Sequence, residues 1–198
     1  MTRGGPPPLP RFGATVELLV HTLVRFIETI SRLGGYTAAA LVLTLVFLMV
    51  YEVVVRYVFS APTVWGYELS TWVMGASFVL AIAYALMSNS HVRVDFLHDL
   101  LGPRARYVFD LLGYVLFVLP LLLWLSWGMW GYFYGALATA ERSGQSAWNP
   151  VIWPFLLVLF LGVVALTLQV IAEIIKSAFG LAGRPLEPGQ AGLSQGQG

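Results

Sequence analysis

The chain has 198 residues, of which 58% are hydrophobic and 11% are charged, and it contains no cysteine. This balance is far more apolar than that of a soluble domain, and the lack of cysteine excludes a disulfide framework and cysteine-ligated metal clusters. The formal net charge of +1 excludes nucleic-acid binding, which requires a concentrated basic face. Four apolar runs reach the ~20 residues that a helix needs to cross a bilayer core of about 30 Å, so the sequence predicts an all-α integral membrane protein.

The segment before the first span is expected to form an N-terminal amphipathic interfacial helix. Residues 1–12 are rich in proline and glycine, lack the apolar core of a cleaved signal peptide, and are predicted to be disordered. Residues 13–33 show a helical repeat, with an apolar face (Val16, Leu19, Val20, Leu23, Phe26, Ile27 and Ile30) opposite a polar one (Glu17, His21, Arg25, Glu28 and Arg32). Such a helix lies along a membrane surface or a partner, or packs on the protein's own loops. Gly34-Gly35 is expected to separate it from the four-helix membrane domain, residues 34–178.

The first span is predicted at about residues 36–59 and is free of charges up to Tyr51. Glu52 and Arg56 follow in its last two turns, with the spacing and order that favour an ion pair along a helix. Charges near the end of a span still prefer a partner or a protein-lined environment. The pair therefore either extends to the interface or faces another subunit.

A tight turn at Pro62, placed to start the next helix, leads into a second span at about residues 64–87. Trp65 and Tyr67 at its entry match an interfacial aromatic belt, and Glu68 suits the positive end of the helix dipole. Further along, small residues recur at four-residue spacing, the pattern that lets two helices approach closely in lipid. These helix-packing candidates are Ser77, Ala81 and Ala85.

The rest of the chain is predicted to add two spans joined by polar connections. The connection at residues 88–106 mixes polar and apolar residues and is expected at headgroup level, with His91, Arg93 and Asp95 holding it against lipid or a partner. A long third span at about residues 107–138 contains Pro120, which predicts tilt or a kink. The fourth span is placed at about residues 151–175, and residues 179–198 are predicted to be disordered.

Basic residues predict the orientation of these spans, because cytoplasmic loops carry the excess of lysine and arginine. Nine of them fall on one side (Arg3, Arg11, Arg25, Arg32, Arg93, Arg104, Arg106, Lys176 and Arg184) and two on the other (Arg56 and Arg142). Both termini are therefore expected in the cytoplasm, and the turn at Pro62 and the loop at Glu141 on the outside.

The placement of polar residues argues against chemistry inside the membrane. A membrane cytochrome needs histidines within its spans, whereas His21, His91 and His98 all fall at the cytoplasmic rim. Ionisable residues are almost missing from the middle of each span, so no relay across the membrane can be drawn. The residues thus favour an accessory subunit that is no enzyme and holds no cofactor. A membrane anchor of a redox enzyme and a stand-alone small transporter or channel remain the alternatives.

Short motifs in the first two spans resemble a known family. They are Arg56-Tyr57-Val58-Phe59-Ser60-Ala61-Pro62, then Trp65 and Glu68, then Ala83-Tyr84-Ala85, and His91-Val92-Arg93-Val94-Asp95-Phe96-Leu97. Together they look like the small membrane subunit of tripartite ATP-independent periplasmic (TRAP) transporters, the DctQ type. The later spans agree with that family in number and topology, and a single Glu68 stands where the family often has two adjacent acids.

The resemblance implies a complex in the bacterial inner membrane. The small subunit would bind a large DctM-type membrane subunit, and a periplasmic substrate-binding protein would deliver a small solute, typically an organic acid. The substrate and sodium sites would belong to the large subunit, which moves against the small one as a fixed frame. By this resemblance Arg56, Trp65 and Glu68 would shape the outward rim where the large subunit docks.

Overall fold

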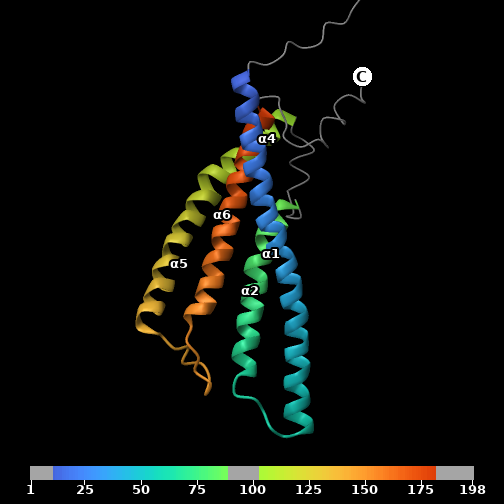
Figure 1. Cartoon of the computed structure of the whole chain (residues 1–198), viewed down its shortest axis with the longest axis vertical. Helices are drawn as coiled ribbons and strands as arrows, with labels where there is room; N and C mark the ends of the chain where they lie inside the picture. The colour runs from blue at the N-terminus through green and yellow to red at the C-terminus, as the bar shows by residue number, and fades with distance from the viewer. Residues whose placement is uncertain (1–10, 89–102, 182–198) are drawn as a thin grey trace, which may run out of the picture.

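The structure is a computed structural model that describes residues 11–88 and 103–181. Within these residues it is helical, without a strand (Figure 1). Its helices are α1 (Arg11–Val58), α2 (Gly66–Met87), α4 (Pro103–Gly113), the π-helical turn η1 (Tyr114–Val118), α5 (Leu119–Thr139) and α6 (Trp153–Leu181). Because α4, η1 and α5 follow one another without a break, the described chain forms four rods, each long and apolar enough to span a membrane. This confirms the predicted all-α protein with four spans.

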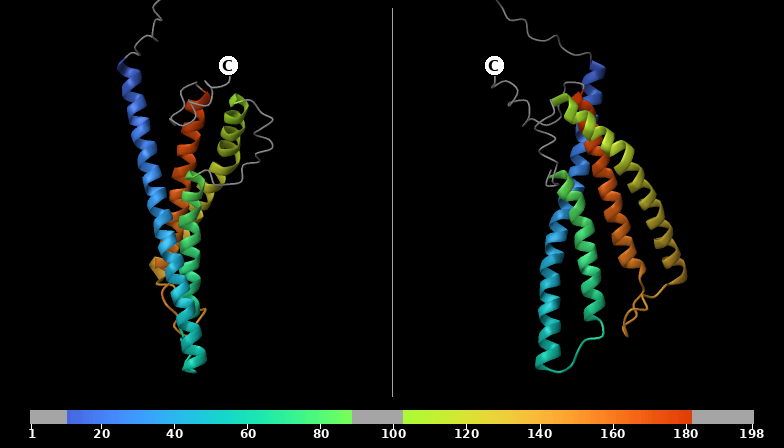
Figure 2. Two further views of the ribbon diagram at one scale, coloured as in Figure 1. Left: turned by 90° about the vertical axis from the view of Figure 1, so that its right-hand side faces the viewer. Right: turned by 180° about the vertical axis from the view of Figure 1, so that it is seen from behind.

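The four rods form two hairpins that meet along α6. α1 pairs with α2, and α5 pairs with α6, while α6 also contacts α1, α2 and α4 (Figures 1 and 2). The two hairpin connections lie toward one end of the molecule, and the start of α1 and the end of α6 lie toward the other. Small buried clusters follow α6 along its length, centred on Ala172, Val170 and Leu156. α6 is therefore the central element.

α1 is one uninterrupted helix of 48 residues, so the predicted break at Gly34-Gly35 is wrong. A glycine inside a helix costs only about 1 kcal/mol relative to alanine, and packing can offset that cost. Here both glycines lie against α2. An added Cβ at Gly35 would lie 2.5 Å from the Tyr84 ring, and one at Gly34 would lie 3.3 Å from the Leu80 carbonyl oxygen. The glycines let two helices approach closely and do not end one.

The predicted amphipathic segment forms the first part of α1, and its apolar face is divided. Ile27 of that face is buried against Ala172 of α6, whereas Leu19 and Phe26 remain exposed. Val24, which was not predicted to belong to this face, is buried beside Ile27. Among the described residues, the segment therefore packs on a helix of its own chain. Its position along a membrane surface stays a prediction.

The distortion expected near Pro120 takes the form of the π-helical turn η1 directly before it. Proline has no N–H to donate, and its ring clashes with the carbonyl four residues earlier in a regular α-helix. The wider turn shows in the Leu119 N–H, which donates to the Tyr114 carbonyl five residues back. The rod changes direction in this region (Figure 2). A π-helical turn before a proline thus explains the bend of the third span.

Candidate functional site

The end of α1 next to the connection at Pro62 holds the predicted ion pair. Arg56 Nη2 donates to Glu52 Oε1 at 2.7 Å, one turn apart on the helix. The Thr63 hydroxyl donates to the other oxygen of Glu52, and it accepts from the Gly66 N–H at 3.1 Å. The carboxylate thus ties the end of α1 to the start of α2.

The connection between α1 and α2 is longer than the sequence suggested. Pro62 was predicted to lie in the first turn of the second span. α2 begins only at Gly66, so Pro62 lies in the connection before the helix. Ser60 adopts a left-handed backbone conformation with φ of 50°. Trp65, directly before α2, stacks on Tyr51 of α1 with ring centroids 5.9 Å apart. Arg56 and Trp65 therefore both lie next to the connection between α1 and α2, and their role in a rim stays a prediction.

Glu68 is placed differently, because the loop between α5 and α6 covers it. Its side chain is fully buried, and the Ser146 hydroxyl donates to its Oε2. Its Oε1 has no hydrogen-bond partner among the residues that the structure describes. Beside it, Trp72 stacks on Phe155 at 5.4 Å and packs against Trp148 at 6.2 Å. Glu68 therefore holds the protein's own loop on α2 and does not present its charge on the rim.

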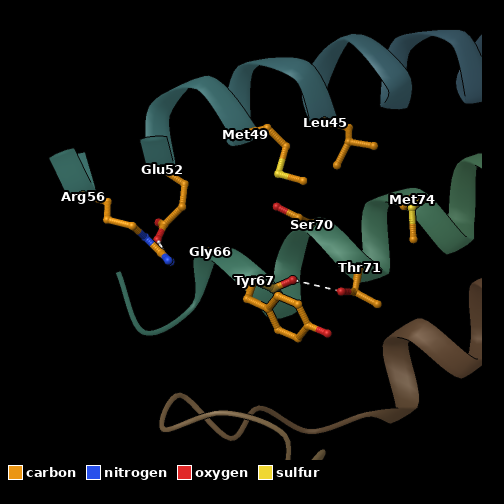
Figure 3. Close-up of a pocket in the computed structure, with 9 residues that line it drawn as sticks. All are labelled: Leu45, Met49, Glu52, Arg56, Gly66, Tyr67, Ser70, Thr71 and Met74. Carbon is orange, nitrogen blue, oxygen red and sulfur yellow. Dashed lines mark hydrogen bonds and ion pairs between the residues drawn. The ribbon is translucent and has the colours of Figure 1, made fainter. Parts of the chain in front are cut away.

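A groove of about 390 Å³ runs between α1 and α2 from the ion pair toward the middle of the span (Figure 3). Its walls are Leu45, Met49, Glu52 and Arg56 of α1 and Gly66, Tyr67, Ser70, Thr71 and Met74 of α2. Ser70 points between the two helices toward Met49. The groove is therefore polar at the end that holds the ion pair and apolar further along the two helices.

A second polar cluster, which the sequence did not predict, joins α1 to α6 near the opposite end. Ser31 donates to Gln169 Oε1 at 2.7 Å, and Gln169 Nε2 donates to Glu173 Oε1 at 3.0 Å. Lys176 Nζ donates to Glu173 Oε1 at 3.0 Å and pairs with Glu28 Oε1 at 2.6 Å. We call these five residues the α1–α6 polar network. Its signal in the sequence is the spacing of Gln169, Glu173 and Lys176 on one face of α6.

The predicted packing residues of α2 are unequally buried. Ser77 is buried and donates to the Met74 carbonyl at 2.8 Å, whereas Ala81 and Ala85 are half-buried. A glycine of α6 allows a close contact with α2, since an added Cβ at Gly162 would lie 2.0 Å from Val79 Cγ1. The packing role of the small residues of α2 stays a prediction. The inner trio His91, Arg93 and Asp95 lies outside the described residues.

These features define a class of membrane protein. Four long apolar helices, with ionisable side chains toward their ends, form a multi-pass membrane protein. Among the described residues, no group of three or more histidines and carboxylates is placed to hold a metal ion.

Comparison with protein families matches residues 45–180 to the family described as tripartite ATP-independent periplasmic transporters, DctQ component. The chain belongs to this family and is a TRAP transporter small membrane subunit, as its motifs predicted. Comparison with curated proteins and with solved structures found no match. The family match begins within α1, so it includes Glu52, Arg56 and Glu68, whereas Glu28 and Ser31 lie before it.

Proposed function

We propose that this subunit is the fixed, non-catalytic frame of a TRAP secondary transporter. A large DctM-type subunit would move against it and carry out ion-coupled uptake of a small organic acid delivered by a periplasmic substrate-binding protein. Sodium coupling would belong to the large subunit. Family membership over residues 45–180 is the observation that carries this proposal. The position of the ionisable side chains toward the helix ends agrees with a frame that anchors a partner.

The outward rim is the proposed docking surface for the large subunit, and the binding protein would approach the same side. Arg56 is exposed, and Trp65, directly before α2, stacks on Tyr51 of the same helix as Arg56. Aromatic residues and arginine often dominate binding energy at interfaces. Glu68 would act indirectly, because its bond to Ser146 holds the loop that completes the rim.

A glycine-lined face of α5 is a second proposed contact for the large subunit. Added Cβ atoms at Gly128, Gly131 and Gly135 would meet nothing within 4 Å. Their spacing places them on one side of the helix, where a partner helix can approach closely. The strongly exposed Trp127 lies on the same helix, one residue before the first of these glycines.

The proposed setting is the bacterial inner membrane with both termini in the cytoplasm. The nine-to-two distribution of basic residues supports this orientation. The exposed Leu19 and Phe26 near the start of α1, with Arg25 between them in sequence, fit contact with anionic lipid headgroups. His91, Arg93 and Asp95 would hold the inner connection there or against the large subunit.

Co-purification from the native membrane tests the proposal. A tag on this chain is expected to retrieve a large membrane subunit, and the reconstituted pair with its binding protein is expected to take up solute. A haem spectrum in the purified sample would instead indicate a redox anchor. Solute movement by this chain alone would indicate a stand-alone transporter or channel.

Two variants test the rim itself. Arg56→Ala and Glu68→Ala are expected to reduce uptake by the reconstituted complex. The matched control is Arg32→Ala, at an exposed arginine of α1 that lies far from the rim. If uptake and co-purification are unchanged in both rim variants, the rim is not the docking surface.

A further inference from the structure

The groove between α1 and α2 is open along the side of the helix pair. All of its walls belong to these two helices. Tyr67, Met49 and Met74 on its border are 70%, 54% and 41% exposed, so no other described element covers it. Its volume of about 390 Å³ lies within the range of ~300–1,000 Å³ that is common for small-molecule sites. In a membrane, this opening faces hydrocarbon chains or a neighbouring subunit.

The groove changes in polarity along its length. Arg56 and Glu52 stand at the outward end, next to the connection between the helices, while Leu45 and Met74 line the inner end (Figure 3). The distance along α1 from Leu45 to Arg56 is about 16 Å at 1.5 Å per residue. One leaflet contributes about 15 Å of a 30 Å bilayer core. The groove therefore has the length and the polarity of one lipid chain with its headgroup.

The two charges at the outward end are not equally accessible. The Arg56 side chain is 52% exposed, whereas that of Glu52 is 12% exposed and already accepts from both Arg56 and Thr63. Glu52 engages Arg56 through Nη2. A guanidinium carries five N–H donors, so Glu52 does not use those on Nε and Nη1. The outward end of the groove thus presents the exposed guanidinium of Arg56, while the carboxylate of Glu52 is sheltered. This arrangement is complementary to a phosphate.

We propose that this groove binds a glycerophospholipid from the leaflet at the Pro62 end. One acyl chain lies against Leu45, Met49 and Met74, and the headgroup phosphate accepts hydrogen bonds from Arg56. Methionine suits such a wall, because its flexible thioether adapts to an irregular chain. The lipid fills space that the two helices leave between them, and it couples Arg56 to the bilayer.

Native mass spectrometry of the full chain in a mild detergent, with palmitoyl-oleoyl-phosphatidylglycerol added, tests this site. The wild type is expected to retain one lipid more tightly than any further ones. Arg56→Gln is expected to weaken that binding about tenfold or more, since hydrogen bonds to a charged group are the strong ones. Arg142→Gln, the matched change at the same end but outside the groove, is expected to leave it unchanged.

A second variant tests the apolar end without touching the ion pair. Met74→Trp fills the inner part of the groove and is expected to displace the acyl chain, whereas Leu123→Trp on α5, at a similarly exposed position, is expected to have no effect. Dioleoylglycerol, which lacks the phosphate, should bind weakly and be insensitive to Arg56→Gln.

Equal lipid binding by the wild type and by both groove variants would overturn the proposal. It would also fall if Met74→Trp released the large subunit and left lipid binding intact, because a partner helix would then occupy the groove. Neither result depends on uptake, so the proposed frame function can stand or fail separately.

Discussion

α5 and α6 are antiparallel neighbours, but the protein buries them to very different extents. In the most apolar window of each span, 39% of the residues are buried in α6 and 6% in the span that contains α5. The glycines follow the same division. An added Cβ at Gly162 of α6 would collide with Val79, whereas one at Gly131 or Gly135 of α5 would meet nothing within 4 Å. The two helices are similarly apolar, so burial and not hydropathy distinguishes them. α6 holds the fold together, whereas the outer face of α5 is available to lipid or a partner.

The comparison predicts that substitutions in α6 change stability, while substitutions on the open face of α5 change association. The largest effect is expected at Lys176, whose replacement by methionine leaves Glu28 and Glu173 without their shared cation. Breaking a buried ion pair from one side costs about 3–5 kcal/mol. The midpoint of thermal unfolding in detergent should therefore fall sharply.

The control for this variant is Arg32→Met, which removes an exposed cation of α1 one turn from Glu28. Exposed substitutions of this kind usually change stability by no more than about 0.5 kcal/mol. If the two variants unfold at the same temperature, the α1–α6 polar network does not stabilise the fold.

The next effect is expected at Gly162, where any side chain collides with Val79. Gly162→Leu should cost about 1–3 kcal/mol or more, because overpacking forces side chains and backbone to shift. Thermal unfolding measures the loss, and a second change, Val79→Ala, should restore part of it by removing Val79 Cγ1, which lies 2.0 Å from the added Cβ. An equal loss with and without Val79→Ala would show that the contact is not the cause.

How much of this division is visible in the sequence depends on the range of the interactions involved. The four spans follow from apolar runs, and the Glu52–Arg56 pair follows from its spacing on one helix. The bond of Ser31 to Gln169 joins residues 138 positions apart, and that of Ser146 to Glu68 joins residues 78 positions apart. No local pattern encodes such partners.

The glycines illustrate the same limit more sharply. Gly34, Gly35 and Gly131 all lie inside a helix, although only the Gly34-Gly35 pair was predicted to end one. Tyr84 lies against Gly35, which makes that glycine a packing contact, whereas nothing lies within 4 Å of a Cβ added at Gly131, which leaves an open face. A local pattern could not tell a helix break from a close approach, so the predicted break failed.

Gly131→Leu tests the α5 side of the comparison. It should leave the unfolding temperature of the isolated subunit nearly unchanged, because nothing lies within 4 Å of the added Cβ. Co-purification of the large subunit should nevertheless fall about tenfold, since a loss of ~1.4 kcal/mol at the interface corresponds to that factor. Leu123→Met, which keeps the size of the side chain at an exposed position of the same helix, is the control variant. Full retention of the large subunit by Gly131→Leu would assign this face to lipid.

The smallest effect is expected where α5 meets α6 through two hydroxyls. Ser126 Oγ and Thr167 Oγ1 lie 3.3 Å apart, and Thr167 also donates to the Val163 carbonyl at 2.8 Å. Hydrogen bonds between membrane helices contribute about 0.6 kcal/mol on average, because the alternative state also finds partners. Ser126→Ala should therefore lower stability by about that amount. Thr167 keeps its backbone acceptor in this variant, so no buried donor is left unpaired. A loss as large as that of Lys176→Met would mean that α5 is held to α6 mainly by this contact, and the contrast between a structural α6 and an open α5 would no longer hold.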